Sequence, residues 1–117
     1  MADQARPFVS NVEADSWEPF EVGDGRVIGE VHFVRAEDDG SFYAGLWRMP
    51  DGPPPEPFDY EIAMNETIRV LEGRVQTQVI GGPAVELSSG DIASFRAGTS
   101  TRWTLRQVPF KELFVLS

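Results

Sequence analysis

The sequence predicts an all-β domain, arranged as an antiparallel sandwich or barrel, and three observations support this class. Apolar and polar residues alternate over short stretches that Gly, Pro and Asp interrupt, which is typical of brief strands. Helix is poorly supported, because the best window, residues 12–20, contains Pro19 and has room for one turn at most. The length of 117 residues fits one ordinary domain, and 41% of them are hydrophobic.

The first half of the chain predicts two strands and a stiff connection. Residues 26–35 carry apolar side chains on both faces, which suits a strand that is covered on both sides. A polar turn at residues 36–41 leads to a second strand at residues 42–49. Residues 50–57 contain five prolines, which exclude helix and central strand there.

The second half predicts short strands that are separated by glycine-containing turns. Expected strands are residues 66–71, 75–79, 85–87, the segment between Asp91 and Ala97, 101–106 and 110–116. Glu72-Gly73 is expected to break the first of these from the second. We therefore expect residues 1–26 to form an N-terminal arm and residues 27–117 to form a single β-barrel domain.

Composition excludes several classes of function. The 10 Lys and Arg against 19 Asp and Glu give a net charge of −9, which argues against nucleic-acid or anionic-membrane partners. Without Cys there is no disulfide, thiol catalysis or Cys-ligated metal. His32 is the only histidine, so sites of two or three imidazoles are excluded, and we expect it to be a hydrogen-bonded structural or interface residue. We find neither a basic leader with an apolar stretch nor a bilayer-length apolar run, so we expect a cytoplasmic protein.

An ordered set of motifs covers the chain from about residue 44 to its end. The motifs are Gly45-Leu46-Trp47 with Pro50-Asp51-Gly52, residues 66–75 (ETIRVLEGRV), residues 90–98 (GDIASFRAG), Trp103 and residues 111–115 (KELFV). This order resembles the cupin superfamily, and within it the small single-domain branch typified by the ureidoglycine-aminohydrolase and ethanolamine-utilisation cupins. The resemblance implies an antiparallel jelly-roll β-barrel around a central pocket. It also implies a homodimer, in which the N-terminal arm and first strands complete a neighbour's sheet.

The usual cupin metal site takes two histidines and a glutamate from the first motif and one histidine from the second. The resemblance places Glu66 at the glutamate position, the first two histidine positions near Asp59–Ile62, and the third at Thr101. None of these is histidine, so we expect no metal and no cofactor. One alternative keeps a hard cation such as Mg²⁺ or Ca²⁺, held by the oxygens of Asp59, Glu61 and Glu66.

Glu66 is the predicted catalytic residue. It alternates with Ile68 and Val70, so its carboxyl group is expected among apolar side chains in the pocket. Loss of solvent there would raise its pKa and suit it to general acid or base catalysis. The alternatives are a Glu that pairs with an arginine, or one that reaches solvent at the barrel mouth.

Further residues are expected to bind the ligand. They are Tyr60, Glu61, Thr101, Trp103, Arg96 and Trp47. Only one of Tyr60 and Glu61 can face inward in a regular strand. Trp103 offers a flat apolar wall, although it also suits the core, and the inward face of residues 42–49 stays open. Arg96 can bind a ligand carboxylate, pair with Glu66 or stay solvated at the rim.

These observations leave more than one function open. The first is a small-molecule-binding cupin without the histidine metal site, which acts as a metal-independent acid–base enzyme (isomerase, lyase or hydrolase) through Glu66. An alternative is a cupin that binds or senses a metabolite without chemistry. A second alternative is a metal-dependent hydrolase like ureidoglycine aminohydrolase, which the missing histidines weaken.

Overall fold

The computed structural model describes residues 6–117 and contains one antiparallel sheet that folds back on itself. Its strands are β1 (Glu18–Glu21), β2 (Val27–Ala36), β3 (Tyr43–Met49), β4 (Phe58–Glu61), β5 (Glu66–Val79), β6 (Ala84–Ser88), β7 (Ile92–Phe95) and β8 (Ser100–Leu116). The main order is β1-β2-β3-β8-β5-β6, with β4 paired to β8 and β7 paired to β5. This confirms the predicted all-β, antiparallel jelly-roll class. No helix forms in the described part of the chain: within residues 12–20 there is one turn at residues 12–13, and β1 follows it and pairs with β2.

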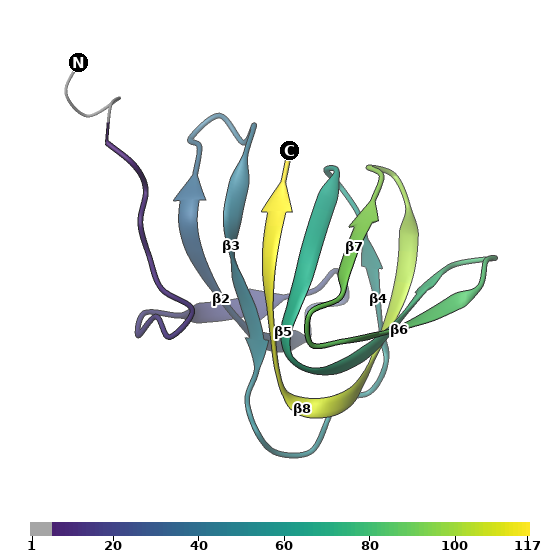
Figure 1. The fold of residues 1–117 in the computed structure, drawn as a ribbon. Coiled ribbons are helices and arrows are strands. Elements are labelled where there is room, and N and C mark those ends of the chain that lie inside the picture. Colours follow the sequence, from purple (N-terminus) through teal and green to yellow (C-terminus); the bar gives the residue numbers. More distant parts are fainter. Residues whose placement is uncertain (1–5) are drawn as a thin grey trace.

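Two long strands, β5 and β8, run through both halves of the folded sheet. Residues 66–69 of β5 pair with β7 and with the end of β8, whereas residues 74–78 pair with β6 and with the start of β8. Figure 1 shows the result, a cup in which β8 curves beneath the molecule and ends at the upper rim. The expected break at Glu72-Gly73 is therefore a bend within one strand, where the register shifts.

Gly73 shows why the bend needs a glycine. Its φ is +82°, which lies in the left-handed region that side chains other than glycine rarely adopt. A Cβ atom at this position would also lie 2.6 Å from the carbonyl oxygens of Gln107 and Pro109 on β8. The two strands thus approach each other at the bend more closely than a side chain allows.

The interior of the cup is rich in aromatic residues. The buried core includes Trp47, Phe58, Trp103, Phe110 and Phe114, and Ile68, Val70 and Val75 of β5 are at most 1% exposed. Within each straight segment the inward residues alternate with exposed ones. The sheet thereby encloses a single apolar interior that both halves share.

The segment before β1 runs beside β2 on the outside of the sheet, as Figure 1 shows. His32 holds it through two contacts, from Nε2 to Ser10 Oγ at 2.6 Å and from Nδ1 to the Ser16 carbonyl oxygen at 2.7 Å. Lys111 adds a bond from Nζ to the Val12 carbonyl oxygen at 2.8 Å. The lone histidine therefore has a structural role in this chain.

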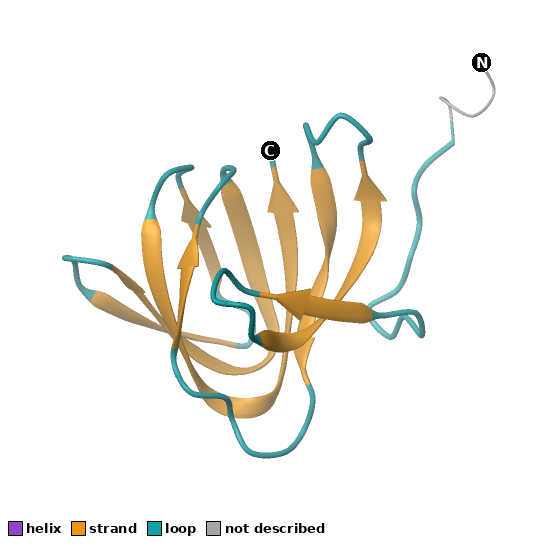
Figure 2. Cartoon of the chain, turned by 180° about the vertical axis from the view of Figure 1, so that it is seen from behind, coloured by secondary structure: helices purple, strands orange, loops and turns teal. Residues whose placement is uncertain are grey.

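The predicted arm of residues 1–26 includes more of the barrel than expected. β1 lies across the other strands, as Figure 2 shows from behind, and Val22 belongs to the buried core. Residues 1–5, which belong to the predicted arm, lie outside the described residues. No helix in the described residues is long and apolar enough to cross a bilayer.

Candidate functional site

A cavity of about 90 Å³ lies inside the cup, and its walls are mainly aromatic. It is lined by Phe20, Val31, Phe33, Trp47, Phe58, Tyr60, Glu66, Trp103, Glu112, Phe114 and Leu116. The indole N–H groups are already occupied, because Trp47 donates to the Ile28 carbonyl oxygen at 2.9 Å and Trp103 donates to Thr101 Oγ1 at 2.9 Å. Polar chemistry in the cavity therefore rests on Tyr60, Glu66 and Glu112.

Glu66 begins β5 and is 5% exposed. Its Oε1 accepts a hydrogen bond from the Tyr60 hydroxyl at 3.0 Å. Burial raises the pKa of the Glu66 carboxyl group, and the bond from Tyr60 opposes that rise because it stabilises the ionised form. Burial and the neighbouring Glu66 charge in turn raise the pKa of the Tyr60 phenol. The phenol therefore stays protonated and acts as the hydrogen-bond donor to Glu66.

Glu112 is a second cavity carboxyl group, and it is not among the site residues that the sequence predicts. It lies on β8 opposite Val70, is 3% exposed, and its Oε1 has no hydrogen-bond partner. Burial, and then the negative charge of Glu66, raise the pKa of Glu112 well above its ordinary value. The signal that identifies it is local, since Glu112 alternates with Phe110 and Phe114, which both face the core.

The structure brings three of the predicted ligand-binding residues to the cavity, namely Tyr60, Trp103 and Trp47. It also settles which face of β3 looks inward. Trp47 lines the cavity, while Arg48 lies on the opposite face, 3.9 Å above the Trp17 ring and 2.9 Å from Glu30.

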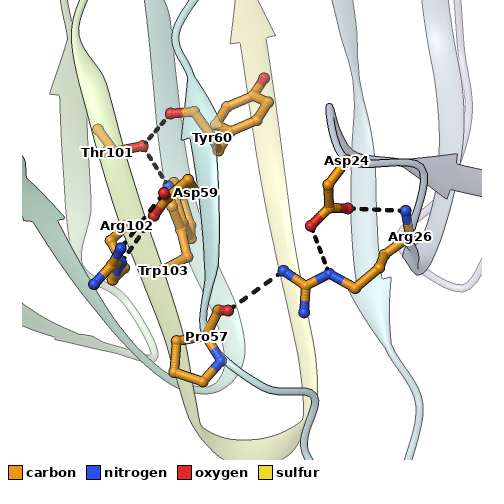
Figure 3. A network of polar contacts seen from close by, with 8 residues as sticks. All are labelled: Asp24, Arg26, Pro57, Asp59, Tyr60, Thr101, Arg102 and Trp103. Carbon is orange, nitrogen blue, oxygen red and sulfur yellow. Dashed lines mark hydrogen bonds and ion pairs between the residues drawn. The ribbon is translucent and has the colours of Figure 1, made fainter.

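Thr101 is 1% exposed but supports the cavity from behind its wall. Its hydroxyl donates to the Tyr60 carbonyl oxygen at 2.6 Å and accepts from the Trp103 indole, as Figure 3 shows. Both functions of the hydroxyl are used in this way. Thr101 therefore positions β4 and Trp103, and its hydroxyl has no free hydrogen-bond donor to offer a ligand.

Two predicted ligand-binding residues lie outside the cavity. Glu61 follows the inward-facing Tyr60, so it points away and accepts a hydrogen bond from Ser100 Oγ at 2.7 Å. Arg96 is exposed in the turn after β7, where its carbonyl oxygen accepts from Thr99. The suggested pair between Arg96 and Glu66 does not form, because the hydrogen-bond partner of Glu66 is Tyr60.

The donor set does not fit a metal. Of the four ligand positions that the cupin pattern uses, only Glu66 carries a metal-ligating side chain in the cavity. The three carboxylates of the hard-cation alternative are separated, since Asp59 pairs with Arg102 at 2.8 Å on the outside and Glu61 bonds to Ser100. Within residues 6–117 no three His, Cys, Asp or Glu side chains are grouped to hold an ion.

A wider surface cleft lies beside the cavity, between the β1–β2 turn and the starts of β4 and β8. Figure 3 shows that Asp24 and Arg26, and likewise Asp59 and Arg102, are paired with each other. Asp24 accepts from Arg26 at 2.8 Å, Arg26 also reaches the Pro57 carbonyl oxygen at 3.4 Å, and Asp59 pairs with Arg102. Because these pairs are exposed and internally satisfied, the cavity is the better candidate site.

The fold and this cavity define a small cupin. The chain belongs to the EutQ-like cupin domain family, whose model matches residues 36–112. The EutQ protein of Clostridium difficile superimposes with a TM-score of 0.64 at 17% identity, covering 84% of this chain and 74% of that protein. A putative ethanolamine utilization protein Q from Salmonella typhimurium gives 0.62 at 18% identity, covering 86% and 93%. These two likenesses show the fold alone.

A further similar structure has no known function. It is a protein of unknown function (DUF1255) from Acidithiobacillus ferrooxidans, with a TM-score of 0.62 and 26% identity over 97% of this chain and 96% of that one. Comparison with the curated proteins found no match. The relatives therefore establish the cupin fold, and the function has to be argued from the cavity.

Proposed function

We propose that the cavity binds a compact organic molecule and that Glu66 transfers a proton to and from it. The observation that carries this proposal is a pair of buried carboxyl groups, Glu66 and Glu112, in an otherwise apolar and aromatic cavity. Burying a carboxyl oxygen without a hydrogen-bond partner costs free energy, and Glu112 Oε1 has no such partner.

Glu66 is the better proton-transfer group of the two. Burial raises its pKa, but the hydrogen bond from Tyr60 opposes that rise, so its ionised form is less costly than that of Glu112, whose Oε1 has no donor. The carboxylate accepts a proton from the ligand and, as the acid, returns it to a neighbouring ligand atom. The aromatic walls exclude water, which keeps the proton between the two partners.

Two NMR measurements test the proposal. The first screens compact amines, alcohols, ketones and carboxylic acids against ¹⁵N-labelled protein and follows the indole N–H signals of Trp47 and Trp103. A screen across these classes that moves neither signal would overturn ligand binding. The second incubates each bound compound in D₂O and follows exchange of its C–H protons for deuterium.

We expect the wild-type protein to accelerate that exchange and Glu66→Gln to abolish it while still binding the compound. The matched control is Glu72→Gln, an exposed residue on the same strand, which should exchange at the wild-type rate. Exchange at the wild-type rate in Glu66→Gln would refute the catalytic role. Binding without exchange in the wild type would identify a binding protein.

A further inference from the structure

The charge of the cavity restricts the kind of ligand that it can accept. Of the residues that line it, only Tyr60, Glu66 and Glu112 can titrate, and none of them becomes positive. The nearby arginines face outward and have carboxylate partners, Arg48 with Glu30 at 2.9 Å and Arg102 with Asp59 at 2.8 Å. An anionic ligand would therefore meet two acidic groups and no counter-charge in this cavity.

Glu112 can accept a hydrogen bond or an ion pair from a ligand. Its Oε1 is buried without any partner, and the only phenol in the cavity already donates to Glu66. A buried carboxyl oxygen left in this state is costly, and a ligand that supplies the missing donor removes the cost.

The aromatic walls suit a cation in the same place. The rings of Phe20, Tyr60, Trp47 and Trp103 pack edge to face, with centroids 6.2 to 6.5 Å apart. Both indoles send their N–H groups to protein acceptors outside the cavity lining, so ring surface is what remains for a ligand. Aromatic faces attract cations through their quadrupole, most strongly where water is excluded.

We propose that the cavity binds a compact organic cation, a protonated or quaternary amine, with Glu112 as its counter-charge. The inference rests on the proposed function, because the cation would occupy the same cavity, and it adds the chemical class of the ligand. Glu66 remains free to exchange a proton with the bound molecule. The net charge of −9 favours the approach of a cation from solution.

Binding of a cation should be linked to release of a proton. If Glu112 is a neutral acid in the free protein, it releases its proton to solvent when the cation binds. In the complex it is the carboxylate beside the cation, so charge and atoms balance. The titratable groups that face Glu112 are Tyr60 on β4 and Glu66 on β5; the lining residues of β1, β2 and β3 carry none. Affinity for the cation should therefore rise with pH until Glu112 is ionised without ligand.

Probes of matched shape test the inference. They are tetramethylammonium and isopropylammonium as cations, tert-butanol as the neutral analogue and pivalate as the anion. Calorimetry in two buffers of different ionisation enthalpy measures affinity and proton release together, and the Trp47 and Trp103 indole signals report whether each probe occupies the cavity. We expect at least one cation to bind tenfold or more tightly than tert-butanol, with proton release, and pivalate to be the weakest.

Glu112→Gln should lower the cation affinity at least tenfold and leave that of tert-butanol unchanged, while the exposed-residue control Glu72→Gln should change neither. Should Glu112→Gln not fold, proton release on cation binding by Glu66→Gln, which keeps Glu112 as the only cavity carboxyl group, decides the point: its presence supports Glu112 as the counter-charge and its absence refutes it. If tert-butanol or pivalate occupies the cavity as tightly as the tighter-binding of the two cations, the cation inference is wrong and the proposed small-molecule site stands. If no probe moves either indole signal, the inference fails together with binding of small molecules of this size.

Discussion

Replacing Glu112 with glutamine is expected to change how the stability of the protein depends on pH. Below the ordinary carboxyl pKa of 4.5, Glu112 is protonated in both the folded and the unfolded chain. Above it, the unfolded chain releases the proton while the folded chain keeps it, because burial raises the folded pKa. The free energy of unfolding of the wild-type protein therefore falls as the pH rises between these two pKa values.

The size of this effect follows from linkage. One group that is protonated only in the folded state costs up to about 1.4 kcal/mol of stability for each pH unit. Between pH 5 and pH 7 the wild-type protein should thus lose at most about 2.7 kcal/mol relative to Glu112→Gln, which has no proton to retain. Other ionisable groups contribute to both proteins, so the difference between the two isolates Glu112 and its coupling to Glu66.

Urea denaturation of both proteins at pH 5, 6 and 7 measures this difference. We expect the stability of Glu112→Gln relative to the wild type to increase steadily across the series. Glu72→Gln, which replaces an exposed carboxyl group on β5, should follow the wild type. A difference between Glu112→Gln and the wild type that stays constant with pH would show that Glu112 is ionised in the folded protein, and the argument for a neutral, buried acid would be refuted.

Other predictions address the bend, the hydrogen bond to Glu66 and the assembly. Gly73→Ala should lower the free energy of unfolding by at least about 2 kcal/mol in urea denaturation, because it places a side chain in the left-handed region and against β8. Gly81→Ala, with a similar φ and open space around it, should lower the free energy of unfolding clearly less. Equal losses in the two variants would contradict the role of the bend. Tyr60→Phe should raise the pKa of Glu66 further, since it removes a donor that favours the ionised form, and a ¹³C NMR titration that shows the same or a lower pKa would oppose this. We also predict a homodimer, which sedimentation of a 13.0 kDa species at micromolar concentration would contradict.

Much of the fold can be predicted from the sequence because alternation and turn residues are local signals. The strand positions at residues 42–49 and 110–116 match β3 and the end of β8 closely. What local signals do not show is that β5 and β8 continue through their bends. Glycine predicts a turn, but only the pairing of β5 with β8 on both sides of Gly73 makes that turn a bend within one strand.

The same bends explain why the candidate site was predicted only in part. On β5 the inward residues are even-numbered before the bend, as at Glu66, and odd-numbered after it, as at Val75. On β8 they are odd-numbered before the bend, as at Trp103, and even-numbered after it, as at Glu112. Alternation therefore identifies Glu66, which lies before the bend of its strand. For Glu112 the alternation has to be taken within the segment after the bend, with Phe110 and Phe114, because a pattern carried across the bend from Trp103 would place that residue on the outer face.

Neighbouring residues also show where pattern and side-chain chemistry diverge. Tyr60 and Glu61 are equally placed by the cupin resemblance, but only Tyr60 faces the cavity, and Glu61 bonds to Ser100. Thr101 is a predicted ligand-binding residue, but it lies behind the cavity wall and its hydroxyl is used by Tyr60 and Trp103. Which polar groups remain free for a ligand depends on contacts between strands that are distant in sequence.

The sharing of β5 and β8 by both halves of the sheet has a consequence for how the protein comes apart. Both halves contain parts of the same two strands, β5 and β8, which pair with each other on both sides of the bend. Unfolding of one half alone would therefore break a continuous ladder of backbone hydrogen bonds. The two halves should therefore lose their structure in one cooperative step. Any movement that admits a ligand must then come from elements at the edge of the sheet, such as β1, and not from a hinge between its two halves.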